Sequence, residues 1–546
     1  VAATKRGAHL ALSLERLEEV ADVPPQRIGL SATQRPLEVI GSFLGGGTYE
    51  NDVWTPRPVQ LIDVPGDKAL DIELVVPVED MTSVTPRPLT PLGVYDGPAE
   101  LPPARTSVWT AIYPRLLEHI RNHRSTIVFA NSRRLAERIC DELNRLAGEE
   151  VARAHHGSVS REQRVEIEEL LKRGELPAVV ATSSLELGID MGAVDLVLQI
   201  ESPISVASGL QRVGRAGHHV GAASRAKVFP KYRGDLLVAT VVVDRMLNRA
   251  VEATRIPRSP LDVLAQHIVA MAGKDTWDVD DLYTLVRRSA PFRDLARGPF
   301  EAVLDMLSGR YPSELFAELR PRIDWDRLAN TIEGRPGALQ LAVQNPGTIP
   351  DRGLYTVHLP DGARVGELDE EMVYESRVGD VFILGASTWR INDITADRVE
   401  VVPAPGASGA TMPFWHGDML GRTIETGRAL GEFTRLIGSL SREDAHRSLI
   451  DRYHLDELAA SNLAGYLAEE LEATGHLPSD QTVVLERFRD EIGDWRIVLL
   501  SPFGARVHAP WAMALSGRFR QTHGRAVDVI WGDDGIALRF PDQDDI

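Results

Sequence analysis

Strand-like and helix-like hydrophobic patterns alternate in the middle of the chain, from residue 106 to residue 250. Short apolar runs with the length and the β-branched composition of buried strands occur at residues 126–129, 178–182 and 196–200. A helical stripe lies between the first two runs and consists of Leu135, Ile139, Leu143 and Leu146. Strands that alternate with helices predict βαβ units around a parallel sheet, so we interpret this region as half of a doubly wound nucleotide-binding fold of the α/β class.

The pattern on the amino-terminal side of this region is different. Leucines recur on one face of a predicted helix over residues 8–20, and residues 27–30 predict a short strand that ends at residues 31–33, Ser-Ala-Thr. From about residue 50 to residue 105 the chain is rich in proline and has no helical pattern. This stretch predicts a linker with one or two strands.

Short amphipathic helices and then short strands follow on the carboxyl-terminal side. The helices are predicted at residues 261–272, 279–288 and 300–307, and together they have the size of a winged helix. Beyond residue 335, short strands with turns such as Asp361-Gly362 predict a β-barrel or a sandwich. Helices return at residues 417–475, and the last strands are expected at residues 496–500 and 527–531.

Length, composition and charge narrow the classes of protein. A chain of 546 residues has room for about three to five domains. Hydrophobic residues make up 43%, but no apolar run reaches the ~18–20 residues of a membrane helix, which excludes an integral membrane protein. Cys140 is the one cysteine, so neither an internal disulfide nor a multi-cysteine zinc site can form, and we expect the reducing cytoplasm. The net charge of −19 argues against a purely electrostatic nucleic-acid binder.

Two arginines occur in the segment 211–218, Gln-Arg-Val-Gly-Arg-Ala-Gly-His. Arg212 and Arg215 are three residues apart, so a helical turn is expected to place both on one face. Guanidinium groups held against a triphosphate offset the charge that develops on a transferred phosphoryl group. A purely structural Gly-Arg helix turn is the alternative.

Loops that follow predicted strands supply further polar candidates. Residues 181–190 leave the end of a parallel strand, the edge where open α/β sheets bind ligands, and Asp190 there can reach a ribose or the two arginines. The candidate phosphate contacts have small polar side chains and are Asn131, Ser158, Thr182 and Ser183. Each of them can instead cap a helix or close a turn.

The order of these motifs resembles that of the superfamily 2 helicases. Residues 31–33 are similar to motif III, 128–132 to motif IV, 181–190 to motif V and 211–218 to motif VI. Beyond residue 250 the resemblance narrows to the large helicase-related (Lhr) family, through residues 381–391 and 413–417.

This resemblance implies RecA-like parallel-sheet domains followed by a winged helix and a β-rich plus helical carboxyl-terminal domain. The expected parts are the end of a first RecA-like domain at 1–50, a linker with short strands at 51–105, a second RecA-like helicase domain at 106–250, a winged helix at 251–335, and a β-rich, barrel-like and helical core domain at 336–546.

The activity that the resemblance implies is that of an ATP-driven 3′→5′ translocase on single-stranded DNA. Such a motor unwinds duplexes, with RNA:DNA hybrids among its substrates and a part in DNA repair, and it uses ATP and Mg²⁺ as a monomeric core. The residues that the resemblance assigns to catalysis are Gln211, Arg212 and Arg215, those for ATP binding are Gly188, Asp190 and the two arginines, and those for interdomain coupling are Ser31 and Thr33.

Two features depart from the family pattern. No Gly-x-x-x-x-Gly-Lys-Ser/Thr sequence occurs in the chain, and its start at Val1 without an initiator methionine suggests an internal fragment. We expect the phosphate loop and the metal-binding Asp-Glu motif upstream, so the fragment alone is expected to be inactive. His218 stands where many helicases of the superfamily have a third arginine, and we expect no loss of function from it.

Trp389 and Arg390 are candidates for holding one base and the adjacent phosphate, since stacking on an indole is blind to base identity. Trp389 lies in an apolar strand, so a core tryptophan is the alternative. The pair His155-His156 has no further ligand at metal spacing, and no metal site is predicted there. Two other functions stay open: an RNA helicase of the same superfamily, and a non-enzymatic winged-helix DNA-binding regulator.

Overall fold

The computed structural model shows two compact units, each built from two separate stretches of the chain. The first unit combines residues 1–65 with 253–351, and the second combines residues 66–252 with 352–546. The structure describes every residue except 32, 51–52, 65–68, 83–107, 187–193, 218–222, 311–319, 350–352, 385–386, 396–397, 406–410, 412–420, 491–492, 525–526 and 541–546. Among the helices of the described residues, none is long and apolar enough to cross a membrane.

The first unit contains a winged helix. The unit as a whole consists of α1 (Lys5–Val20), α2 (Leu37–Gly45), β1 (Gly47–Glu50), β2 (Val53–Pro56), α8 (Leu261–Ala272), β9 (Trp277–Asp278), α9 (Val279–Arg288), α10 (Arg297–Leu307), β10 (Ile323–Asp326), β11 (Thr331–Gly334) and α11 (Ala338–Gln344). From α8 to β11 the order is helix, strand, helix, helix, strand, strand, and the strands form one sheet in the order β10-β11-β9. The three helices predicted here from the hydrophobic pattern are confirmed.

The strand predicted at residues 27–30 is not formed. This segment pairs with no strand among the described residues, and Ile28 and Leu30 are 77% and 99% exposed. A strand depends on hydrogen bonds to a neighbour, so an apolar segment without such a neighbour stays a loop.

A six-stranded parallel sheet is the centre of the second unit, with the strand order β3-β8-β7-β4-β6-β5. Its strands are β3 (Leu70–Leu74), β4 (Thr126–Phe129), β5 (Ala152–His155), β6 (Ala178–Ala181), β7 (Leu196–Ile200) and β8 (Ser224–Phe229). Its helices are α3 (Trp109–Arg121), α4 (Arg133–Ala147), α5 (Arg161–Arg173), α6 (Val206–Val213) and α7 (Arg233–Leu247).

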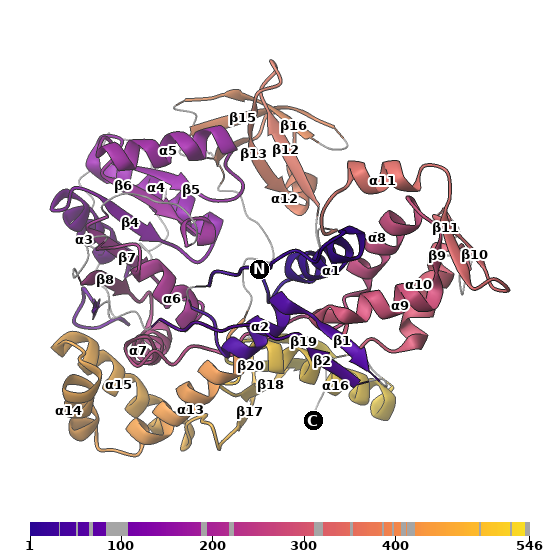
Figure 1. Cartoon of the computed structure of the whole chain (residues 1–546). Coiled ribbons are helices and arrows are strands. Elements are labelled where there is room, and N and C mark those ends of the chain that lie inside the picture. The colour runs from indigo at the N-terminus through magenta and orange to yellow at the C-terminus, as the bar shows by residue number, and fades with distance from the viewer. Residues whose placement is uncertain are drawn as a thin grey trace. The chain divides into compact units, whose positions relative to one another are not determined.

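The helices cover both faces of this sheet (Figure 1). One apolar cluster packs α3 and α4 against the strands, and a separate cluster packs α5, α6 and α7 against them. The three predicted strands and the predicted helix between them are present, which confirms the α/β fold class. β3 comes from the expected linker at 51–105 and forms one edge of the sheet.

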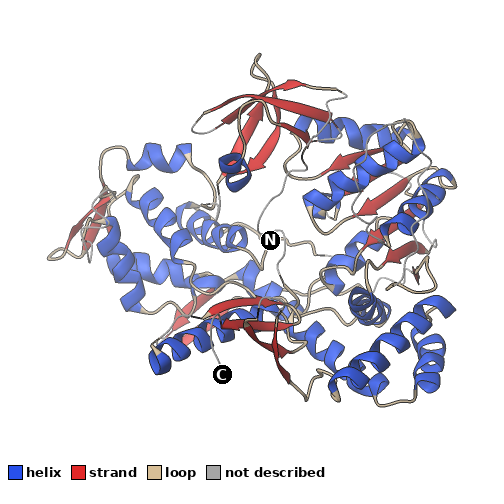
Figure 2. Cartoon of the chain, turned by 180° about the vertical axis from the view of Figure 1, so that it is seen from behind, coloured by secondary structure: helices blue, strands red, loops and turns tan. Residues whose placement is uncertain are grey.

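A second sheet of the same unit appears as the red strands at the top of Figure 2. Its strand order is β13-β12-β16-β15-β14. Its elements are β12 (Leu354–His358), β13 (Arg364–Asp369), α12 (Glu370–Glu375), β14 (Val381–Leu384), β15 (Ser387–Ile394) and β16 (Arg398–Pro403). The outermost strands β13 and β14 are not paired with each other, so the described strands make an open sheet and no closed barrel.

Helices and a four-stranded antiparallel sheet complete the second unit. Its last elements are α13 (Ile424–Gly438), α14 (Arg442–Tyr453), α15 (Glu457–Thr474), β17 (Val484–Arg489), β18 (Trp495–Leu500), α16 (Ala505–His523), β19 (Asp528–Gly532) and β20 (Gly535–Phe540), and the strand order is β17-β18-β20-β19. Leucine and phenylalanine side chains of α13 and α15 share an apolar cluster with α7. The helices and strands predicted for this region are confirmed.

Candidate nucleotide and nucleic-acid site

The candidate site lies at the carboxyl ends of the parallel strands of the second unit. β4 is hydrogen-bonded to both β6 and β7, so the loops that leave these three strands are neighbours. α6 follows β7 and starts at Ser205, whose hydroxyl accepts the N–H of Ser208 over 3.1 Å. The carboxylate of Glu252 accepts the N–H of Val206 over 2.7 Å at the same helix start. These caps hold α6, and with it the segment 211–217, in place at this edge.

Arg212 is the buried centre of the edge, with 1% of its surface exposed. Its Nη1 donates to Asn131 Oδ1 over 2.8 Å and to Gln199 Oε1 over 3.0 Å. Its Nε and Nη2 lie 2.8 and 2.7 Å from Glu186 Oε1. Burial lowers the pKa of Arg212, and the Glu186 carboxylate raises it. Arg212 therefore ties motif VI to motifs IV and V through charge-assisted hydrogen bonds.

Arg215 is less buried than Arg212, although both side chains contact Glu186. α6 ends at Val213, and its C-cap Gly214 still has right-handed helical dihedral angles, so Arg215 lies just beyond the end of the helix. Arg215 is half-buried, and its Nη2 donates to the backbone O of Glu186 over 2.9 Å. Burial also lowers the pKa of Arg215. Of the two arginines, Arg215 is the one whose side chain stays partly exposed to a ligand.

The four candidate phosphate contacts differ in how far their side chains are already engaged. Asn131 Nδ2 donates to the backbone O of Ser202 over 2.8 Å, while its Oδ1 accepts from Arg212. Thr182 is 9% exposed, and the exposed Ser183 begins a short 3₁₀ helix after β6. Ser183 is therefore the most accessible of the four.

Ser158, the fourth candidate, connects the parallel sheet to the five-stranded sheet. It is fully buried, and its hydroxyl accepts from Arg133 Nη1 over 2.7 Å. Its backbone O accepts the N–H of Glu367 over 2.8 Å, and the N–H of Ser160 donates to Val365 O over 3.2 Å. The loop at Ser158 thus pairs with β13 through two backbone hydrogen bonds.

Trp389 lies in the core of the five-stranded sheet, not at a rim where a base can stack. The residue is 8% exposed, and its Nε1 donates to Leu384 O over 2.9 Å. It packs in one apolar cluster with residues of β12, β13 and β16. This position corrects the expectation of a stacking indole, because both the ring and its polar N–H already have protein partners. The neighbouring Arg390 is exposed.

Of the remaining predicted residues, some fall outside the described part of the chain and two belong to the first unit. Gly188, Asp190 and His218 are outside the described residues, as is the segment 413–417. Ser31 is exposed and Thr33 is half-buried in the first unit. Within the described part of the chain, no group of three or more His, Cys, Asp or Glu residues is placed to hold a metal ion.

Sequence reasoning missed the acidic partners of this edge. Glu186 accepts from both arginines, through its carboxylate and its backbone O, and its place in a small-residue loop after a strand was an available signal. Asp235 accepts the N–H groups of Ser202 and Lys231, each over 2.9 Å. Burial raises the pKa of Asp235 to about 6, although these two hydrogen bonds lower it. No pattern in the sequence distinguishes Asp235 from a surface aspartate.

The fold and this edge define the class of protein: it contains the RecA-like parallel-sheet domain of the helicases. Residues 110–220 match the helicase conserved C-terminal domain. Residues 244–411 match the winged helix domain of large helicase-related protein, and residues 477–546 match the DEAD/H associated domain. The chain belongs to the large helicase-related (Lhr) family, as its motifs suggested.

Relatives support this assignment over the whole chain. The Lhr helicase/probable uracil glycosylase of Mycolicibacterium smegmatis is 49% identical over 100% of this chain and 37% of its own length. The ATP-dependent helicase Lhr-Core protein 2 of Thermococcus barophilus is 36% identical over 90% of this chain and 54% of its own length. The structure of Mycobacterium smegmatis helicase Lhr bound to ssDNA and AMP-PNP aligns with a TM-score of 0.76 and 47% identity, over 99% of this chain and 63% of that one. The chain thus spans between about a third and two thirds of these relatives.

Proposed function

We propose that the intact protein is an ATP-dependent helicase that moves 3′→5′ along single-stranded DNA and unwinds DNA or RNA:DNA duplexes. The observation that carries the proposal is Arg215, half-buried and anchored to motif V at the ligand-binding edge of a parallel sheet. A relative bound to both ssDNA and AMP-PNP supports a nucleotide-driven motor on DNA. A relative that is named a probable uracil glycosylase as well as a helicase supports a role in DNA repair.

The two arginines have different roles in this proposal. Arg215 approaches the transferred phosphoryl group of ATP with Gln211 beside it, whereas Arg212 positions the motifs from inside. Gly188 and Asp190 complete the nucleotide contacts, Ser31 and Thr33 couple the two RecA-like domains, and Mg²⁺ is held by residues outside this chain. Exposed Ser183 and Arg390 contact the phosphates of the strand. We further propose a monomeric motor core in the cytoplasm.

A non-enzymatic winged-helix regulator is the less favoured alternative. In such a protein the third helix reads base edges in the major groove, and its outer side carries polar or basic groups. The outer side of α10 instead shows Pro299, Ala302 and Met306, and its Arg297 is paired with Asp280 and Glu301. This helix is a poor candidate for reading a DNA sequence.

The test uses the intact protein with 3′-tailed and 5′-tailed duplexes and with single-stranded DNA or RNA as ATPase activator. We expect DNA to stimulate ATP turnover more than RNA, and unwinding only from a 3′ tail. Arg215→Ala should lower turnover by about 10³-fold or more, as loss of an arginine finger does. Arg173→Ala, at an exposed position of the same domain, is the matched control. Equal turnover in Arg215→Ala and Arg173→Ala, with both proteins folded, would remove the assignment.

A further inference from the structure

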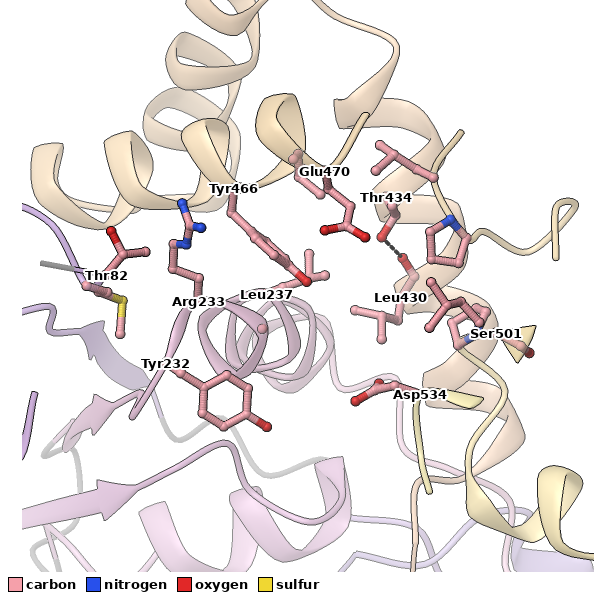
Figure 3. A pocket seen from close by; sticks show the side chains of 17 residues that line it. Thr82, Tyr232, Arg233, Leu237, Leu430, Thr434, Tyr466, Glu470, Ser501 and Asp534 are labelled. Atoms are coloured by element: carbon pink, nitrogen blue, oxygen red, sulfur yellow. Dashed lines mark hydrogen bonds between the residues drawn. The ribbon is translucent and has the colours of Figure 1, made fainter. Parts of the chain in front are cut away.

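A pocket of about 400 Å³ lies in the second unit, where α7, α13 and α15 meet the sheet of β18 and β20 (Figure 3). Small-molecule sites have volumes of about 300–1,000 Å³. Most of the wall is apolar and includes Leu237, Leu430, Leu467 and Leu500. None of the described motif residues at the edge of the parallel sheet lines it, so we treat it as a separate cavity.

Negative charge exceeds positive charge around this pocket. The carboxylate of Glu470 is half-buried and has no hydrogen bond or ion pair with any described residue. A second carboxylate, Asp534, is 3.0 Å from Arg422 but keeps 74% of its side chain exposed. Among the described residues of the wall Arg233 is the one cation, and Glu469 outside the wall neutralises it over 2.7 Å. Glu470 is therefore the uncompensated charge of the pocket.

Hydroxyl groups complete the polar part of the wall. Figure 3 shows the Glu470 carboxylate and the Tyr466 hydroxyl pointing into the same space, with Asp534 and Tyr232 on its other side. Burial and nearby carboxylates raise the pKa of Tyr232 to about 12 and also raise that of Tyr466, so both phenols are neutral at neutral pH and can accept a hydrogen bond. Ser501 is 1% exposed, and its Oγ has no hydrogen-bond partner among the described residues.

We propose that this pocket binds a small organic cation, a protonated amine carried on an apolar or aromatic body. The ammonium group lies against Glu470, Asp534 across the pocket adds negative charge, and the body packs on the leucines. A phosphate-bearing ligand is repelled by the two carboxylates. A neutral apolar ligand leaves the Glu470 carboxylate desolvated and unpaired, which opposes its binding. Of these three kinds of ligand, only the organic cation both pairs with the Glu470 carboxylate and packs against the apolar wall.

The test compares two probes of equal shape, 2-phenylethylamine and 2-phenylethanol, titrated into the 546-residue chain and followed by NMR and calorimetry. We expect the amine to bind about ten-fold more tightly than the alcohol, as a charge-assisted hydrogen bond allows. Glu470→Gln removes this preference. Glu472→Gln, an exposed position on the same helix that does not line the pocket, keeps it.

A pocket-filling variant locates the binding independently. A Cβ at Gly234 comes within 3.0 Å of the Tyr232 ring and 3.9 Å of the Tyr466 hydroxyl, so Gly234→Ala narrows the cavity. It should weaken both probes several-fold without loss of folding, because alanine favours the helix α7. The proposal is overturned if the amine does not bind, if amine and alcohol bind equally, or if Glu470→Gln leaves the preference unchanged.

Discussion

At the residue scale, removal of the Arg212 side chain would leave the carboxylate of Glu186, which is 13% exposed, without its cation. Breaking a buried ion pair from one side typically lowers stability by about 3–5 kcal/mol. We expect Arg212→Ala to lower the free energy of unfolding by this amount in chemical denaturation. Arg215→Ala, at a half-buried position, should lower it by about 1 kcal/mol or less. Equal stabilities of the two variants would contradict the inward role of Arg212.

Trp389 provides a second residue-scale prediction. Truncation of a buried tryptophan costs about 3–5 kcal/mol, so Trp389→Ala should lower the thermal midpoint, and ATPase and unwinding of the intact protein should fall together. Trp389→Phe should recover most of the stability, because it keeps a buried aromatic ring. It loses only the hydrogen bond from Nε1 to Leu384 O. A folded Trp389→Ala protein with an unchanged midpoint that hydrolyses ATP but does not unwind would restore the stacking interpretation.

Asp235 makes the stability of the second unit depend on pH. Its pKa in the folded protein is about 6, above its usual value, because burial disfavours the carboxylate and the nearby Glu201 adds to this effect. A raised pKa means that the folded state binds the proton more tightly, so the contribution of Asp235 to stability is present at low pH and lost as the pH rises through about 6. The difference in unfolding free energy, wild type minus Asp235→Asn, should therefore fall between pH 4 and pH 7. A difference that rises or stays constant would be inconsistent with this pKa.

At the scale of elements, β13 meets the loop at Ser158 so closely that no Cβ fits at Gly366. A Cβ there would lie 2.2 Å from the backbone O of Ser158. We expect Gly366→Ala to separate the two sheets locally and to raise hydrogen exchange about ten-fold or more at the N–H groups of Ser160 and Glu367. Gly157→Ala, in the same loop but with open space at its Cβ, is the control. Unchanged hydrogen exchange at these two N–H groups in Gly366→Ala would show that the loop at Ser158 shifts to accommodate the Cβ while its hydrogen bonds to β13 remain.

At the scale of the whole molecule, the 546 residues contain no Gly-x-x-x-x-Gly-Lys-Ser/Thr loop to hold the ATP phosphates. We expect the chain alone to show no ATPase stimulation by single-stranded DNA. We expect it to bind single strands weakly through residues 106–400, with an affinity that falls as salt rises. Robust ATP hydrolysis by the pure chain, measured beside the intact protein, would show that these residues form a complete nucleotide site without that loop.

Local sequence was sufficient for most elements of the fold. The strands β4, β6 and β7 and the helices α4, α8 and α9 were predicted within a residue or two, because apolar periodicity reports a regular backbone and the face that it buries. The order of four motifs likewise indicated the superfamily 2 helicases, and residues 381–391 and 413–417 indicated the Lhr family, since motifs and their order are properties of the chain alone. Accurate prediction ended where a residue depends on a partner that is distant in sequence.

Tertiary structure decided the direction and the partners of the site residues. Arg212 turns inward because Asn131, Glu186 and Gln199, 81, 26 and 13 residues away, offer it acceptors. Ser158 is buried because β13 comes to it from more than 200 residues further along the chain. Spacing along the sequence shows which residues share a face of one element, but only the packing of several elements determines whether that face meets solvent, another strand or a buried carboxylate.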